Sequence, residues 1–162
     1  MPTITVEKGV IIDRPAHEVW RFISEEHNVT KWHGDVHSHA KEENTTHQVR
    51  KFGGHRMEMR HEVQHDHESW TRDFRGQVDT NFGMQEYEGQ HIVTPAGDNA
   101  CTVTSKMVAN LAHLPAEAEQ AMERMAAHTI EGNLMTLKHL LEASPELHEH
   151  LQQAHPEWHS SS

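Results

Sequence analysis

The five residues His61-Glu62-Val63-Gln64-His65 carry side chains that can bind a metal ion or move a proton. They spell H-E-x-x-H, which in zinc proteases puts two histidines one helical turn apart and a glutamate beside the metal-bound water. The flanking residues argue against a helix, because Met57, Met59 and Val63 alternate with charged residues at a period of two. We therefore predict a β-strand here and interpret the protease motif as a chance match.

A strand still allows a different kind of metal site. Residues two and four apart share one face of a strand, so His61, His65 and His67 could supply ligands from neighbouring positions. His91 or His128 would then add a ligand from across the protein. Imidazole suits zinc and nickel. The alternative is that the 18 histidines are a feature of composition and mostly solvated, so we expect no required cofactor.

Arg72 is the second residue with chemical potential, because Trp70 and Phe74 share its face of a predicted strand. A guanidinium between two aromatic side chains is costly to bury without an anionic or carbonyl partner. A ligand carboxylate would be such a partner. The alternative partner is Glu86 or Glu88 on the neighbouring strand.

Several predicted strands and one long helix would position these residues. Alternating apolar residues and turn signals predict strands over 3–13, 35–43, 49–52, 55–64, 69–76, 83–94 and 100–111, and helices over 15–25, 27–32 and 115–142. Consecutive strands favour an antiparallel meander. A curved meander around one long helix would be an α+β architecture that encloses a cavity.

The long helix carries one apolar stripe that changes character along its length. Its members recur at steps of three and four, as the face of a helix requires, and are Ala118, Met122, Met125, Ala126, Ile130, Leu134, Leu137 and Leu141. The second half is leucine, whereas the methionines and alanines of the first half pack less specifically. The first half could leave room for a ligand. The alternative is that these methionines are ordinary core.

Composition narrows the function classes. The net charge of −11, from 25 acidic and 14 basic side chains, argues against nucleic-acid or anionic-membrane partners. The chain shows neither a membrane span nor a signal sequence, so we expect a cytoplasmic protein. Its length suits one domain over 1–143 followed by a polar, histidine-containing extension over 144–162. The single cysteine, Cys101, is expected to be a reduced core residue.

Particular residues give this order of elements a family resemblance. Three stretches resemble the START-like superfamily, also called SRPBCC. They are the opening Ile12-Asp13-Arg14-Pro15-Ala16-His17-Glu18-Val19-Trp20, Trp32 after it, and the closing run from Gly132 to Glu142. That superfamily includes birch-pollen-allergen-like proteins and polyketide cyclases/dehydrases. The resemblance implies a helix-grip fold, in which a curved antiparallel sheet of about seven strands wraps a long C-terminal helix, with two short helices after the first strand.

The resemblance also implies an apolar pocket between the sheet and the first half of the long helix. The implied ligand-binding residues are Trp32, Met57, Met59, Trp70, Phe74, His91, Met122, Met125 and Thr129. Cyclase-like chemistry would need a group that moves a proton and a donor that holds an enolate. His61 is our candidate acid/base, Arg72 the oxyanion partner and Tyr87 a further donor. For the apolar residues, ordinary core packing remains the alternative.

The sequence thus leaves three functions open. The first is a cavity protein that binds a small hydrophobic or aromatic molecule, with or without cyclase-like turnover. The second is a histidine-based metal-binding protein or metal-dependent enzyme. The third is an interaction module whose histidines protonate together near pH 6. Either a monomer or a homodimer would be compatible with each.

Overall fold

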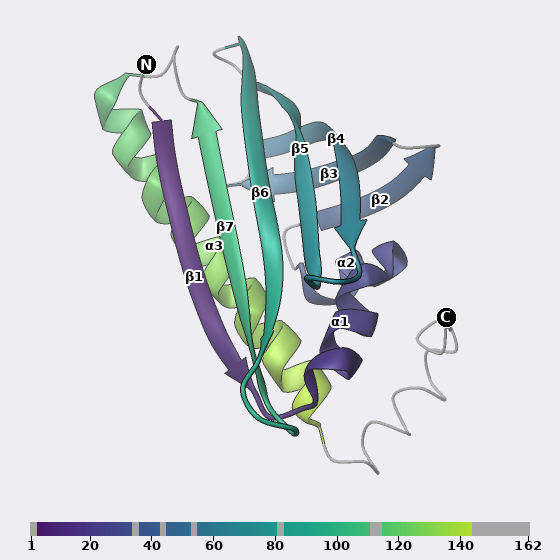
Figure 1. Cartoon of the computed structure of the whole chain (residues 1–162). Helices are drawn as coiled ribbons and strands as arrows, with labels where there is room; N and C mark the ends of the chain where they lie inside the picture. The colour runs from purple at the N-terminus through teal and green to yellow at the C-terminus, as the bar shows by residue number, and fades with distance from the viewer. Residues whose placement is uncertain are drawn as a thin grey trace.

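One antiparallel sheet of seven strands curls around a long helix in the computed structural model (Figure 1). The structure describes residues 3–33, 36–42, 45–52, 55–80, 83–110 and 115–143, with side chains described in 3–33, 59–78, 85–110 and 115–143. The predicted extension over 144–162 lies outside the described residues. The helix-grip α+β fold predicted from the sequence is confirmed.

The elements follow the predicted order closely. They are β1 (Thr3–Ile12), α1 (Ala16–Ser24), η1 (Glu26–Asn28), α2 (Val29–Trp32), β2 (Val36–Glu42), β3 (Thr45–Phe52), β4 (His55–Asp66), β5 (Thr71–Thr80), β6 (Gly83–Pro95), β7 (Cys101–Asn110) and α3 (Ala116–Glu142). The third strand is longer than the predicted 49–52, because Thr45 and Thr46 already pair with β2. The strand order is β1-β7-β6-β5-β4-β3-β2.

Figure 1 shows α3 lying behind β1 and β7, while β2, β3 and β4 curl across the far side of the sheet. The short helices α1 and α2 cover the lower end between these two parts. The sheet therefore has a concave face toward the helices and an outer face without a helix among the described residues. None of the described helices is long and apolar enough to cross a membrane.

The predicted alternation of β4 is confirmed. Met59 and His61 are buried, whereas Arg60 and Glu62 between and beyond them are exposed. The segment that spells H-E-x-x-H is therefore strand, and its two histidines lie on one face of the sheet rather than on a helix turn.

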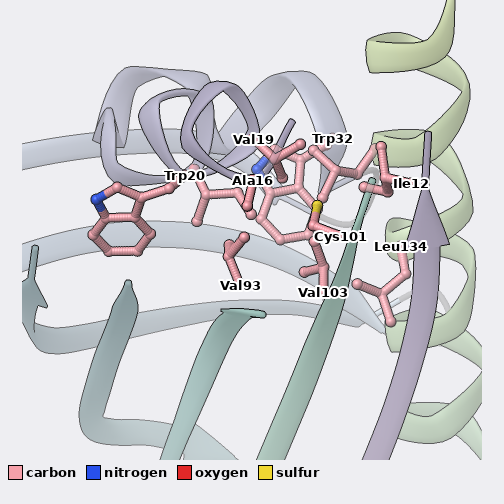
Figure 2. Close-up of a cluster of buried hydrophobic side chains, with 11 residues drawn as sticks. Ile12, Ala16, Val19, Trp20, Trp32, Val93, Cys101, Val103 and Leu134 are labelled. Atoms are coloured by element: carbon pink, nitrogen blue, oxygen red, sulfur yellow. The ribbon is translucent and has the colours of Figure 1, made fainter. Parts of the chain in front are cut away.

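The buried core is densest at the leucine half of α3. Leu134 and Leu137 are 2% and 0% exposed and pack in the larger cluster with residues of β1, α1 and β7. Figure 2 shows Trp20, Trp32 and Cys101 among the side chains of this cluster. Cys101 is fully buried as a free thiol, as predicted. A smaller cluster joins Ile4 and Val6 to the methionine half of the helix.

The C-terminal end of α3 is tied to the loop after β1. Arg14 donates from Nε to the Leu141 carbonyl at 2.7 Å and from Nη2 to the Ala143 carbonyl at 3.0 Å. The Glu142 carboxylate accepts from the Asp13 backbone N–H at 2.6 Å. The two bonds from Arg14 satisfy carbonyls at the helix end that lack intrahelical partners.

Candidate functional site

A cavity of about 100 Å³ lies between the concave face of the sheet and the first half of α3. Residues of β1, α2, β4, β5, β6, β7 and α3 line it: Ile4, Trp32, His33, Met59, Phe74, Val78, Gln85, Glu86, Tyr87, His91, Ser105, Met107, Ala109, Met122, Ala126, Thr129, Ile130 and Asn133. Most of these side chains are apolar. The expected difference between the two halves of the helix stripe is confirmed, because leucine packs solidly and the methionine half borders the cavity.

Six of the nine predicted ligand-binding residues line this cavity, and so does one residue of the predicted catalytic set. Those that line it are Trp32, Met59, Phe74, His91, Met122, Thr129 and, from the predicted catalytic set, Tyr87, while Trp70 and Met125 fall outside the lining. Trp70 lies in the turn before β5 with a φ of 53° and packs against the larger core cluster. The side chain of Met57 is outside the described ones.

Sequence analysis missed several polar residues of the wall. His33, Gln85, Ser105 and Asn133 are all buried there. Alternation along β6 and β7 could have found Gln85 and Ser105, because each shares parity with a buried neighbour on its own strand. His33 follows a helix of only four residues, and no periodic pattern extends that far.

Arg72 is bound to a carboxylate that sequence analysis did not consider. Its Nε and Nη2 each donate to an oxygen of Glu26 at 2.7 Å, and the two side chains are 3% and 9% exposed. The expected partners, Glu86 and Glu88, are both exposed on the opposite face of the sheet. That prediction was wrong, because Arg72 pairs with His91 across the strands and so points to the concave side.

Glu26 also accepts a hydrogen bond from Nε2 of His65 at 2.8 Å. Burial raises the pKa of Glu26, but the hydrogen bonds from Arg72 and His65, with their charges, outweigh burial and hold this pKa well below its usual value. Glu26 is therefore ionised at neutral pH, and it compensates the buried charge of Arg72. Arg72 and Glu26 both lie outside the cavity lining. The guanidinium is therefore not positioned to contact a ligand in the cavity directly.

Arg72 determines the tautomer of His91. Its Nη1 lies 3.3 Å from Nδ1 of His91, and a guanidinium can only donate, so Nδ1 accepts and the neutral ring carries its proton on Nε2. His33 has the opposite arrangement. Its Nδ1 lies 3.2 Å from the Val29 carbonyl, which can only accept, so Nδ1 carries a proton and, in the neutral ring, Nε2 is the basic nitrogen.

The imidazole rings of His33 and His91 are both buried in the cavity wall, and their centroids are 5.5 Å apart. The centroids of the His33 and Trp32 rings are 3.8 Å apart. The cavity wall thus contains two histidines whose Nδ1 atoms have opposite hydrogen-bond roles. Histidine is the side chain that most often serves in general acid–base chemistry.

His61, the predicted acid/base, is buried next to the cavity wall rather than in it. Its Nδ1 is 2.7 Å from the hydroxyl of Tyr87, which does line the cavity. The rings of His61 and Phe74 are 5.9 Å apart. His61 can therefore polarise the Tyr87 hydroxyl, which is the predicted further donor.

The histidines predicted to bind a metal have separate partners. His61 contacts Tyr87, His65 contacts Glu26, and Nδ1 of His67 accepts from the indole N–H of Trp20 at 3.1 Å. In the part of the chain that the structure describes, no three His, Cys, Asp or Glu side chains are grouped so that they could hold a metal ion. His128, named as a ligand from across the protein, is exposed.

Two further hollows of about 700 and 480 Å³ lie on the outer face of the sheet. The walls of both include the charged side chains of Glu62, Arg75 and Glu88. Ligand sites for small organic molecules are mostly apolar with a few placed polar groups. The smaller cavity on the concave face fits that description better.

Comparison with known proteins agrees with this architecture. The family model described as "Polyketide cyclase / dehydrase and lipid transport" matches residues 3–142. The chain belongs to this family. A comparison with curated protein sequences finds no match.

Three solved structures superpose well on the chain. The di-domain ARO/CYC protein BexL from the BE-7585A biosynthetic pathway has a TM-score of 0.73 and 20% identity over 88% of this chain, which spans 48% of BexL. The Zhui aromatase/cyclase from a Streptomyces strain has a TM-score of 0.73 and 12% identity, covering 89% of this chain and 99% of that one. Truncated norcoclaurine synthase from Thalictrum flavum has a TM-score of 0.67 and 14% identity, covering 88% and 95%. At these low sequence identities, the similarity shows that the chain shares the fold of these three proteins.

Proposed function

We propose that the cavity between the sheet and α3 binds a small hydrophobic or aromatic molecule. The observation that carries this proposal is the contrast along α3, where leucines pack solidly and the methionine half borders the cavity. Aromatic rings of Trp32, Phe74 and Tyr87 offer flat faces for an aromatic ligand. Membership of a family described by cyclase, dehydrase and lipid-transport activities supports the same function.

A variant that fills the cavity tests this proposal. Ala126 is 6% exposed and lines the cavity, so Ala126→Phe would occupy the space with a benzyl group. Saturation-transfer NMR with toluene as the probe should show binding to the wild type and little or none to this variant. Overpacking costs about 1–3 kcal/mol, so circular dichroism must confirm that the variant is folded.

Ala116→Phe is the matched control, since Ala116 is exposed in the first turn of the same helix. It should bind toluene as the wild type does. Equal toluene signals from the folded Ala126→Phe variant and the wild type would place the ligand elsewhere and refute the proposal.

We further propose acid–base turnover of a bound ketone as a second candidate function, because His33 and His91 have opposite tautomers in the cavity wall. Nε2 of His33 would take a proton from the carbon next to the carbonyl, and Nε2–H of His91 would hydrogen-bond to the enolate oxygen. Tyr87 keeps its predicted role as a donor. His61 and Arg72 would act by positioning Tyr87 and His91.

Proton exchange detects such turnover without knowledge of the natural substrate. Wild-type protein in D₂O should accelerate deuterium incorporation into the methyl group of acetophenone, followed by NMR. His33→Phe and His91→Phe should each lower the rate by about 10²-fold or more, which is the usual contribution of one acid or base. If the wild type exchanges deuterium no faster than buffer alone, the acid–base proposal is refuted, while the ligand-binding proposal still stands.

A further inference from the structure

Gln85 of β6 is a primary amide in the wall of the cavity. The residue is 4% exposed, and among the described residues its Nε2 has no hydrogen-bond partner. A buried donor without a partner loses the hydrogen bonds that water gives it in the unfolded chain. Such a group in a native structure calls for an explanation, and a bound molecule that accepts its hydrogen bond is one.

The neighbours of Gln85 do not satisfy it. The residue opposite it on β5 is Val78, and across the cavity α3 presents Met122 and Ala126. The last torsion of a glutamine rotates over a broad range, so the amide N–H₂ can be directed into the cavity without moving the backbone. A carbonyl-type oxygen on a bound molecule would accept from it.

The size of the cavity restricts that molecule. Its volume of about 100 Å³ is close to the roughly 150 Å³ of an engineered cavity that holds benzene. Sites for larger, drug-sized ligands measure roughly 300–1,000 Å³. One ring with a short substituent is therefore the class that fits.

We propose that the cavity selects a single-ring compound that carries a carbonyl-type oxygen, and that Gln85 determines this selection by donating a hydrogen bond to that oxygen. The inference rests on the proposed ligand-binding function and adds the chemical class of the ligand. It concerns a different side chain from those that would move protons.

Two probes of nearly the same shape test the hydrogen bond. Acetophenone carries C=O where α-methylstyrene carries C=CH₂, so their affinities for one site differ chiefly through a polar partner. The wild type should bind acetophenone about fivefold to tenfold more tightly, and Gln85→Met should remove that preference while it keeps or improves binding of α-methylstyrene. A two-ring ketone such as 2-acetonaphthone should bind the wild type at least tenfold more weakly than acetophenone.

Gln77→Met is the control, because Gln77 is exposed on the outer face of β5 and undergoes the same substitution. It should preserve the preference for acetophenone. If both probes bind the wild type equally, or if Gln85→Met keeps the preference, Gln85 does not select the ligand, although the cavity still binds one. If neither probe binds the wild type, the proposed function fails together with this inference.

A spectroscopic measurement on the wild type makes the test independent of how well the variant folds. The side-chain N–H₂ signals of Gln85 in a ¹⁵N-labelled sample should shift on addition of acetophenone and remain nearly unchanged with α-methylstyrene. Equal shifts with both probes would contradict a hydrogen bond to the carbonyl oxygen.

Discussion

Glu26 joins the short helical segment to the sheet through Arg72 on β5 and His65 on β4. Sequence reasoning recognised that Arg72 needs an anionic or carbonyl partner, and it named a ligand carboxylate or, alternatively, Glu86 or Glu88. The alternation of β6 excludes these two glutamates as partners. Tyr87 and His91 face inward, so the glutamates between and beside them must face out. No local pattern identifies Glu26, since its contact depends on where a three-residue turn lies in the folded protein.

Removing the Glu26 charge should destabilise the fold. Glu26→Gln leaves the Arg72 guanidinium buried without its anion, and breaking one side of such a pair costs about 3–5 kcal/mol of unfolding free energy. Urea denaturation measures the change. Glu18→Gln, an exposed residue of α1, should change stability by less than about 0.5 kcal/mol. A loss as small as the control's would mean that water already compensates Arg72.

Acid should weaken the same interaction. The pKa of Glu26 is lowered in the folded state from its ordinary 4.5, so its contribution is fully present above that pH and declines as the pH falls toward the folded value. Wild-type stability should therefore drop steeply below about pH 4.5. The Glu26→Gln variant should show a shallower drop in urea titrations between pH 5 and 3. Parallel pH profiles would contradict the assignment.

Cys101 should not react while the protein is folded. Its side chain is fully buried, and burial raises the pKa of its thiol to about 11, so the reactive thiolate is scarce at neutral pH. A chromogenic disulfide reagent should label one thiol per chain only after denaturant is added, since the chain has a single cysteine. Fast labelling of native protein would show that β7 opens locally.

At the scale of elements, periodicity predicted β4 and α3 well because each has one buried face over many residues. The H-E-x-x-H string was correctly placed on a strand for this reason. Trp70 was not, because a left-handed backbone at tryptophan carries no signal in the sequence. Trp70 consequently lies in the turn before β5 and outside the cavity lining.

Two glycines should respond in opposite ways to alanine. A Cβ at Gly76 would overlap the Arg60 carbonyl oxygen and the Cα and Cβ of His61, so Gly76→Ala forces β4 and β5 apart and should cost more than about 2 kcal/mol. At Gly132 in α3 a Cβ would meet nothing within 4 Å, so Gly132→Ala should stabilise by about 0.5–1 kcal/mol. Thermal unfolding compares both with the wild type. Similar shifts in the same direction would contradict the packing at Gly76.

At the scale of the whole molecule, the order of elements and a few family-like residues were enough to predict the architecture. They were not enough to predict the cavity wall. Alternation can mark Gln85 and Ser105 as inward-facing, but it does not show that the folded sheet brings them together with Asn133 of α3. Metal binding by His61, His65 and His67 stays a prediction, which elemental analysis of untagged protein can test.

A chain that ends at Ala143 should fold and bind as the full chain does. Both described hydrophobic clusters consist of residues between Ile4 and Leu141, and Arg14 already holds the end of α3. Midpoints of thermal unfolding should agree within a few degrees, and toluene binding should be equal. If the shortened chain loses thermal stability or toluene binding, the extension over 144–162 contributes to the structure.

The pairing of β1 with β7 has a consequence for synthesis on the ribosome. Ile12 meets Cys101 and Thr3 meets Asn110, whereas each of the other strand pairs joins neighbours along the chain. Strand β1 is translated well before β7, so it must wait with Ile4 and Val6 uncovered until β7 has been made. Chaperones that hold nascent chains would meet this protein at its N-terminal strand, and refolding from denaturant should be limited by this long-range closure.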